Sequence, residues 1–219
     1  MDTITGAPRP LRRDAERNRQ RILAAAGPLI AEHGLSVSYD QIAEAAEVAV
    51  GTVYRRFPDK DSLIEALFTG KVEGAVESSR AALKIQDPWQ ALVTFMVKAL
   101  EIQAHDRGLK ELAMGSSRGT ALACRAQELF EPLVNELVDR CHEAKILRAG
   151  VGMQDLLLIP IMVGGVMDSA RTVDPDLWRR TLTIALDGLR ICNAGPLPGA
   201  TPTSAQLDTI MTNWHPPGR

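Results

Sequence analysis

The sequence predicts an all-α protein of about nine helices, and three observations favour this class. Aromatic residues make up only 4% of the 219 residues, whereas Ala, Leu, Ile and Met are plentiful, and unbranched side chains lose little rotamer freedom in a helix. Apolar residues recur at helical spacing along most of the chain. Because no segment combines sustained alternation with β-branched residues, we expect no sheet.

The N-terminal segment is expected to be a flexible basic arm followed by a long helix. Residues 1–13 carry three arginines together with glycine and proline, a composition typical of a mobile arm. Helical periodicity begins at residue 14 and ends at Gly34, which supplies a stop. Pro28 lies inside this helix and lacks a backbone donor, which predicts a kink near Gly27.

Capping signals mark the next helices. Ser38 and Gln41 form a capping box for a short second helix, in which each side chain satisfies an orphan backbone group. After a tight turn, residues 50–57 are expected to form a third helix. Asp59 is placed to cap a long fourth helix over residues 60–83.

The rest of the chain is expected to hold five helices and a tail. The helices are predicted over residues 88–105, 108–114, 120–147, 153–172 and 175–193. Pro88 and Pro175 each follow an aspartate, at a first-turn position that tolerates proline. Residues 195–219 contain five prolines and no apolar periodicity, so we expect a mostly disordered tail with at most a loose turn.

The charge distribution is compatible with nucleic-acid binding. The net charge is −2, but six arginines and two acidic residues fall between Arg9 and Arg21, a local charge of +4. A locally basic surface attracts phosphate even when the whole chain is mildly acidic.

Cysteine usage and hydropathy indicate a soluble, cytoplasmic protein. Cys124, Cys141 and Cys192 are odd in number and lack paired spacing, which favours reduced thiols over a disulfide framework. The N-terminus has no apolar run of the kind found in signal peptides. The longest apolar stretch, residues 156–167, is too short to span a bilayer.

Residue types that carry catalysis are scattered. An enzyme needs clustered acid, base or nucleophile groups, but His33, His105, His142 and His215 lie far apart in the sequence. Cys141 and His142 are adjacent and so point to different sides of a helix. Because no phosphate-binding glycine loop or metal-ligand spacing is found, we expect neither an enzyme nor a bound cofactor or metal.

The segment SYDQIAEAAEVAVGTVYRRF, residues 38–57, meets the requirements of a helix-turn-helix. Such a motif places one short helix in the major groove and braces it with a second. Ala43 and Ala46 allow the two helices to cross closely, and Gly51 lets the backbone approach DNA. The donors suited to phosphates and base edges are Thr52, Tyr54, Arg55 and Arg56.

Residues 17–68 resemble the TetR family of bacterial repressors. The match runs from RNRQRILAAAGPLIAEHGL through IAEAAEVAVGTVYRRFPDKDSLIEALF. The resemblance implies a helix-turn-helix domain over residues 14–60 and a ligand-binding and dimerisation domain over residues 61–194. It also implies a homodimer that binds a palindromic double-stranded DNA operator and is released from it by a small apolar effector.

The resemblance assigns DNA contacts to nine residues. Ser38 and Tyr39, at the start of the second helix, are expected to touch phosphates, helped by the positive helix end. Val50, Gly51 and Thr52 are expected to face the bases, with Val50 limited to apolar contacts. The remaining residues, expected to hold the DNA backbone, are Tyr54, Arg55, Arg56 and Lys60.

Two positions depart from the family pattern. The family usually has glycine in the turn, where this chain has Glu47, and a left-handed backbone there costs about 1 kcal/mol or more. The family usually has serine or threonine capping the recognition helix, where this chain has Ala49, at a cost of about 1 kcal/mol. Both departures bear on the detailed phosphate contacts.

The last two helices are expected to form the dimer interface that the resemblance implies, with an intramolecular core as the alternative. Adjacent glycines destabilise a helix, so Gly164 and Gly165 suggest that another helix packs very close. The residues assigned to this interface are Gly164, Gly165, Met167, Leu182, Leu186 and Leu189.

The resemblance also implies a small-molecule pocket in the C-terminal domain. Candidates lie at helical spacing on expected inner faces, where methionine suits an adaptable apolar cavity; plain core packing is the alternative. The candidates are Trp89, Met96, Leu100, Met114, Phe130, Val134, Leu137 and Met162. His105 and His142 are expected at the surface.

Two other classes of function are weighed against a DNA-binding regulator. A helical dimerisation protein with a degenerate DNA-binding module would carry the same motif but would not bind DNA upstream of its gene. A membrane-surface protein is disfavoured, because the basic residues cluster at the N-terminus and not along an apolar helix.

Overall fold

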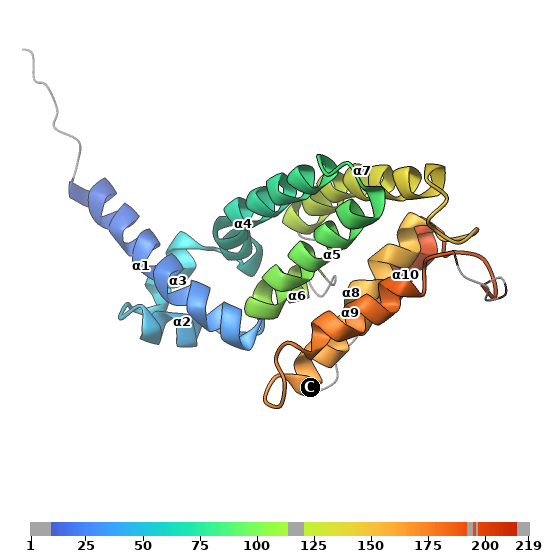
Figure 1. The fold of residues 1–219 in the computed structure, drawn as a ribbon. Helices are drawn as coiled ribbons and strands as arrows, with labels where there is room; N and C mark the ends of the chain where they lie inside the picture. The colour runs from blue at the N-terminus through green and yellow to red at the C-terminus, as the bar shows by residue number, and fades with distance from the viewer. Residues whose placement is uncertain (1–9, 114–120, 192–194, 196, 214–219) are drawn as a thin grey trace, which may run out of the picture.

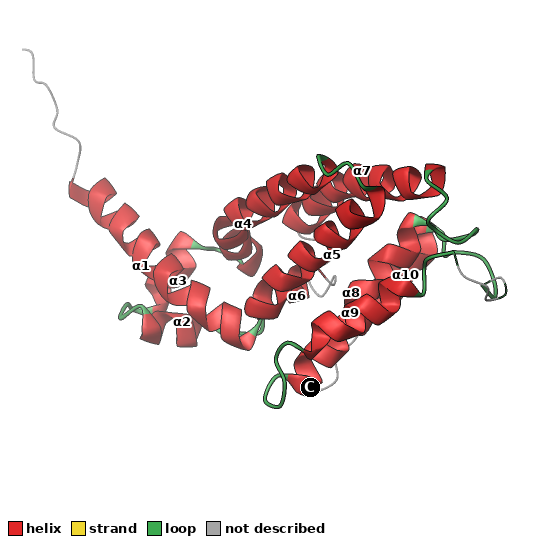
Figure 2. Ribbon diagram, viewed as in Figure 1, coloured by secondary structure: helices red, strands yellow, loops and turns green. Residues whose placement is uncertain are grey.

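The chain folds into helices, as the sequence predicts. The computed structural model describes residues 10–113, 121–191, 195 and 197–213, and within these ranges it contains ten helices and no strand (Figure 2). The all-α class is therefore confirmed, with one helix more than the nine expected.

The helices fall into groups that follow chain order. The N-terminal group consists of α1 (Pro10–His33), α2 (Tyr39–Ala45) and α3 (Val50–Arg56). The middle helices are α4 (Lys60–Leu83), α5 (Pro88–His105), α6 (Arg107–Ala113) and α7 (Ala121–Glu143). The last are α8 (Met153–Ala170), α9 (Leu177–Asp187) and α10 (Ser204–Asn213). Figure 1 shows α1 to α3 at one end, α4 packed with α5 and α7, and α8 alongside α9.

The predicted capping signals are present. Ser38 Oγ accepts from the backbone N–H of Gln41 at 3.2 Å, and Ser38 N–H donates back to Gln41 Oε1 at 2.8 Å, which completes the capping box of α2. Asp59 caps α4 by accepting from Ser62 N–H at 2.7 Å. These caps fix where α2 and α4 begin, and so position α3 between them.

The predicted arm over residues 1–13 is wrong for its last four residues. Residues 10–13 form the first turn of α1, because proline is tolerated where a helix donates no hydrogen bond, and leucine and arginine are good helix formers. Residues 1–9 lie outside the described part of the chain. α1 continues through Pro28 as one helix to His33.

Two helices are shorter than expected because the segments after them pair with each other. Arg148 N–H donates to the Leu189 carbonyl at 2.9 Å, and Ile191 N–H donates to the Ile146 carbonyl at 2.8 Å. This pairing requires extended backbone on both sides. α7 therefore ends at Glu143 and α9 at Asp187, before residues 147 and 193.

The expected disordered tail contains α10, so that prediction is wrong for residues 204–213. Thr203 and Gln206 form a second capping box, with hydrogen bonds of 2.9 and 3.2 Å between side chains and backbone N–H groups. Leu207 is buried against Ile161 of α8. A cap and one apolar anchor thus hold a helix in a proline-rich segment.

Two apolar clusters form the core. The N-terminal cluster joins α1 to α4 and includes Leu109 and Leu112 of α6. The C-terminal cluster joins α4, α5, α7, α8 and α9, with Leu92, Leu137 and Trp178 almost fully buried. Because α6 contributes to the N-terminal cluster, the DNA-binding motif and the C-terminal domain are packed together rather than linked by a free segment.

α8 is long and apolar enough to cross a membrane by length and composition. Leu156, Ile159 and Val163 on this helix are nevertheless buried in the C-terminal cluster, and α9 packs along it. We therefore treat α8 as a core helix. Its 18 residues also exceed the apolar stretch identified in the sequence.

Candidate nucleic-acid interface and cavity

α3 is anchored by two apolar side chains and presents its other side to solvent. Val53 is fully buried and Phe57, directly after the helix, is 2% exposed. On the opposite side, Val50 is 37% and Tyr54 55% exposed, and no atom lies within 4 Å of a Cβ built on Gly51. A short helix with one buried edge and one open edge can enter a DNA groove.

The open side of α3 carries hydrogen-bond donors. Arg55 and Arg56 are exposed, and Arg55 Nη2 donates to Thr52 Oγ1 at 3.0 Å, which orients the guanidinium. The Tyr54 ring packs edge-on against Tyr39, with centroids 4.8 Å apart. We call the surface of Val50, Gly51, Thr52, Tyr54, Arg55 and Arg56 the α3 face.

Both departures from the family pattern are visible in the turn before α3. Glu47 has a φ of 52°, in the left-handed region that glycine adopts without strain. Arg21 Nη2 lies 3.4 Å from both the backbone carbonyl and the carboxylate of Glu47. Ala49 caps α3 without any side-chain hydrogen bond.

Tyr39 and Lys60, expected to touch DNA, have partners inside the protein. The Tyr39 hydroxyl donates to the Asp59 carbonyl at 2.5 Å, and burial, followed by the nearby Asp59 charge, raises the pKa of Tyr39 to about 12. Lys60 Nζ donates to the Val37 carbonyl, and burial lowers the pKa of Lys60. The structure thus gives no support to phosphate contacts by these two residues, whereas Ser38 stays exposed at the α2 cap.

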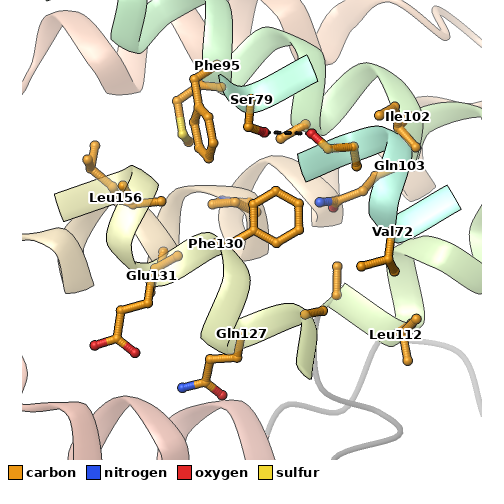
Figure 3. A pocket seen from close by; sticks show the side chains of 18 of the residues that line it. Val72, Ser79, Phe95, Ile102, Gln103, Leu112, Gln127, Phe130, Glu131 and Leu156 are labelled. Atoms are coloured by element: carbon orange, nitrogen blue, oxygen red, sulfur yellow. Dashed lines mark hydrogen bonds between the residues drawn. The ribbon is translucent and has the colours of Figure 1, made fainter. Parts of the chain in front are cut away.

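A cavity of about 450 Å³ lies in the C-terminal domain between α4, α5, α7 and α8 (Figure 3). α6 forms one part of its wall through Leu109 and Leu112, and α10 contributes Ser204 and Leu207. The lining is mostly apolar, which suits a small hydrophobic ligand.

Three of the predicted ligand residues line this cavity: Met96, Phe130 and Val134. Leu100 and Leu137 have no exposed surface and belong to the core instead. These two are therefore corrected, because apolar residues on inner helix faces can equally fill the core.

The other three candidates lie elsewhere. Met162 is 56% exposed and faces solvent, so its assignment to the cavity is wrong. Trp89 lies under the Arg190 guanidinium, 5.0 Å from the ring centroid, and does not line the cavity either. Met114 is outside the described residues.

Sequence reasoning missed the polar groups of the cavity. Ser79 and Gln103 line it and are 6% and 8% exposed. The Ser79 hydroxyl donates to the Ala75 carbonyl at 2.8 Å, one turn earlier on α4 (Figure 3). Gln103 interrupts the apolar periodicity of α5, and a glutamine on an otherwise apolar helix face was the signal available.

α6 connects the cavity wall to the DNA-binding domain. Glu111 accepts a hydrogen bond of 2.8 Å from the backbone N–H of Leu35, just after α1. Gly108 lies so close to α1 that a Cβ there would be 2.4 Å from a methyl group of Ile30. Lys110, one residue before Glu111, donates to the Gly164 carbonyl at 2.8 Å and to Asp168 at 2.6 Å, both on α8.

The predicted interface residues divide between core and surface. Met167, Leu182 and Leu186 are at most 6% exposed and belong to the C-terminal cluster of the same subunit. Their assignment to a subunit interface is corrected, because their side chains are not accessible to a partner. Gly164 is buried and Leu189 is half-buried against that cluster.

Other apolar residues of α8, of α9 and of the segment just after α9 are exposed. Leu177, Ile184 and Ile191 lie seven residues apart and are 36%, 63% and 58% exposed. On α8, Met162 is exposed and the space above Gly165 is open within 4 Å. We call these five residues the α8–α9 surface.

The remaining polar candidates have ordinary structural surroundings. His105 is exposed, as expected, but His142 is half-buried, with Nε2 2.8 Å from the Val151 carbonyl. Within the described residues no group of histidine, cysteine and carboxylate side chains could hold a metal ion. Cys124 and Cys141 are free thiols, burial raises the pKa of Cys141 to about 11, and Cys192 lies outside the described residues.

An N-terminal helix-turn-helix with an open recognition helix, followed by a helical domain with an apolar cavity, defines a DNA-binding regulator. Residues 22–67 match the family of bacterial regulatory proteins described as the tetR family. Residues 87–191 match the C-terminal domain of SbtR-like transcriptional regulators. The chain belongs to the TetR family and is a DNA-binding transcriptional regulator. Since this family is not enzymatic, an enzyme is excluded.

The chain is similar to several known proteins. An HTH-type transcriptional regulator of Staphylococcus aureus is 43% identical over 54 residues, a match that covers 24% of this chain and 29% of that relative. A TetR regulatory protein from Mycobacterium vanbaalenii is 32% identical over 83% of this chain and all of its own, with a TM-score of 0.44. A TetR regulator from Streptomyces coelicolor is 28% identical over 78% of this chain and 98% of its own, with a TM-score of 0.51.

Proposed function

We propose that the chain is a cytoplasmic, homodimeric repressor that is released from a palindromic operator when a small apolar molecule fills the cavity. The α3 face of each subunit reads one half-site, through Val50, Gly51 and Thr52 at the bases and Tyr54, Arg55 and Arg56 at the backbone. Ser38 adds a phosphate contact at the start of α2.

The position of α6 is the observation that carries the ligand-release part of the proposal. Leu109 and Leu112 form part of the cavity wall, while Glu111 on the same seven-residue helix bonds to Leu35 beside α1. A short helix cannot be displaced on one side without changing its contacts on the other. A ligand that shifts α6 therefore alters the position of α1 and of the motif that α1 supports.

The α8–α9 surface supports the dimer. Leu177 and Ile184 lie seven residues apart on α9, Ile191 lies just after that helix, and all three are at least 36% exposed in the described subunit. Exposed apolar patches mark protein–protein contacts, and these exposed side chains are the candidates for one. A two-fold contact through these helices presents two α3 faces to successive major grooves.

Reciprocal titration tests the proposal. The protein is titrated onto DNA from upstream of its own gene by fluorescence anisotropy, with and without Nile red, a neutral apolar dye. We expect Nile red to weaken operator binding, and saturating operator to weaken Nile red binding by the same factor, because the two effects share one coupling free energy. Absence of specific binding would support a dimerisation protein with a degenerate DNA-binding module. Unchanged dye affinity on the operator would rule out release through this cavity.

A further inference from the structure

Gln103 places one polar group in the interior of the cavity. The residue is 8% exposed, and its Oε1 atom is buried without a hydrogen-bond partner among the described residues. Figure 3 shows the nitrogen end of its amide directed toward the ring of Phe130, and both residues line the cavity. Buried polar groups are nearly always paired, so an unpaired buried Oε1, on a side chain that lines a cavity, points to a polar group of a ligand that reaches it on binding.

The charges around the cavity favour a neutral ligand over an anion. Among the described lining residues, Lys98 and Glu131 carry opposite charges, and both side chains are exposed. Lys98 is already paired with Glu101, with Nζ 3.1 Å from Oε2. A carboxylate or phosphate inside the cavity would thus lose its hydration without gaining a free cation.

The amide chemistry selects the polar group of the ligand. Gln103 Oε1 can only accept, so its partner must donate, while the amide nitrogen can only donate. A hydroxyl group does both at once, whereas an ether or ketone only accepts. Ser79, on the facing helix α4, uses its proton on Ala75 and adds a further acceptor.

We infer that the cavity takes a neutral, mostly hydrocarbon molecule whose hydroxyl group pairs with the side-chain amide of Gln103. This rests on the proposal that the cavity is the effector site. Gln103 lies in the last turn of α5, and Asp106, three residues later, caps α6 by accepting from Leu109 N–H at 2.9 Å. A hydroxyl held by Gln103 is therefore bound next to the helix that contacts α1.

Two isomeric probes test the hydroxyl requirement. n-Decanol and methyl nonyl ether have the same composition and similar length, but only the alcohol donates a hydrogen bond. By titration calorimetry we expect the wild-type protein to bind n-decanol about tenfold more tightly than the ether, the factor for one ordinary hydrogen bond. Decanoate, an anion of matching length, is expected to bind more weakly than n-decanol.

Gln103→Leu should abolish the preference for the alcohol, since leucine keeps the bulk and loses the amide. The unliganded variant should melt no lower than wild type, because an unpaired buried polar atom is removed. Gln127→Leu is the matched control: Gln127 also lines the cavity but is exposed, and its loss should leave the preference unchanged.

Equal binding of alcohol and ether by the wild type, no binding of n-decanol, or tighter binding of decanoate would overturn the inference. Persistence of the preference in Gln103→Leu would overturn the role of Gln103. These measurements contain no DNA, so their outcome tests the ligand assignment independently of operator binding and release. Binding of n-decanol through Gln103 without operator release would refute ligand release and leave the cavity assignment intact.

Discussion

The backbone of Glu47, in the turn of the DNA-binding motif, is strained. Its φ of 52° places a side chain where glycine is favoured, and its contact with Arg21 is between largely exposed groups 3.4 Å apart. Exposed ion pairs contribute about 0–1 kcal/mol, which is less than or similar to the cost of the left-handed backbone, about 1–2 kcal/mol. The left-handed conformation of the turn is therefore stabilised by the packing of the helices on either side, and not by the Glu47 side chain.

Glu47→Gly is expected to raise the free energy of unfolding by about 1 kcal/mol, because glycine adopts the left-handed conformation without the Cβ clash. Urea denaturation measures the change. Glu47→Gln keeps the strain and removes the charge, so it should be neutral or slightly destabilising. Lys145, with a φ of 56°, offers a parallel test through Lys145→Gly. A loss of stability in Glu47→Gly would mean that the Arg21 contact outweighs the strain.

The two tyrosines of the motif are expected to have different roles, Tyr54 in DNA binding and Tyr39 in stability. Removing the hydroxyl of each in turn tests this. Tyr54→Phe keeps the edge-on contact with Tyr39 and removes an exposed hydroxyl. If that hydroxyl binds a phosphate, operator affinity falls by about 1–2 kcal/mol with no change in stability. Tyr39→Phe should lower stability instead, because the Asp59 carbonyl loses its donor. Anisotropy and thermal melting distinguish the two, and unaltered operator affinity in Tyr54→Phe would remove Tyr54 from the DNA contacts.

At the level of helices, local signals predicted the structure where they were strong and failed where a distant segment intervened. The capping box of Ser38 and Gln41 marked α2 correctly. An equivalent T-x-x-Q pattern at Thr203 and Gln206 marks the start of α10. The prolines around it favoured a disordered tail, and so the helix was not predicted. The ends of α7 and α9 depend on pairing between residues far apart in the sequence, which periodicity does not report.

α6 carries consecutive charged residues that bind to different parts of the molecule. Lys110 and Glu111 are 4% and 7% exposed. Lys110 bonds to α8 and Glu111 to the backbone after α1. Burial is the largest effect on Lys110 and lowers its pKa, while the hydrogen bond to Asp168 opposes that shift. Since buried charges are costly unless paired, these contacts fix α6 between α8 and the DNA-binding domain.

Glu111→Ala is therefore expected to weaken the coupling between cavity and operator. Leu35 N–H loses its acceptor, so only packing still joins α1 to α6, and the factor by which Nile red and operator weaken each other should fall toward one. Stability should also fall, by about 1–3 kcal/mol for an unpaired buried donor. Glu111→Gln retains an acceptor for Leu35 and serves as the control, with coupling close to wild type. Full coupling in Glu111→Ala would show that another contact transmits the signal.

For the whole molecule, the sequence identified the pair of apolar helices but not which side of each faces outward. Both sides of α9 are apolar: Trp178, Leu182 and Leu186 point into the subunit, whereas Leu177 and Ile184 point out. Periodicity identifies the main apolar side of a helix but does not say whether that side packs within the subunit or against a partner, so interface and core residues cannot be told apart by periodicity. Tertiary packing makes that distinction, and three residues predicted at the interface lie in the core of the subunit instead.

The last prediction concerns the α8–α9 surface as a whole. Ile184 is 63% exposed on α9, between Leu177 on the same helix and Ile191 just after it. In a two-fold interface, Ile184→Arg introduces one charge from each subunit and places it against the apolar surface of the other. Because burying an unpaired charge is costly, the substitution opposes association strongly. We expect this variant to sediment as a monomer at concentrations where the wild type is a dimer. Operator affinity should fall as well, because a monomer binds each half-site independently and loses the gain from linked binding.

Thr183→Arg is the matched control for this prediction. Thr183 is exposed on the same helix, one residue before Ile184, and its hydroxyl donates to the Arg179 carbonyl at 2.9 Å. The same charge placed there should leave the dimer and operator binding close to wild type. Sedimentation velocity on both variants, with thermal melting to show that each is folded, decides the matter. A wild-type monomer at micromolar concentration, or an Ile184→Arg variant that remains a dimer, would show that the subunits associate through another surface.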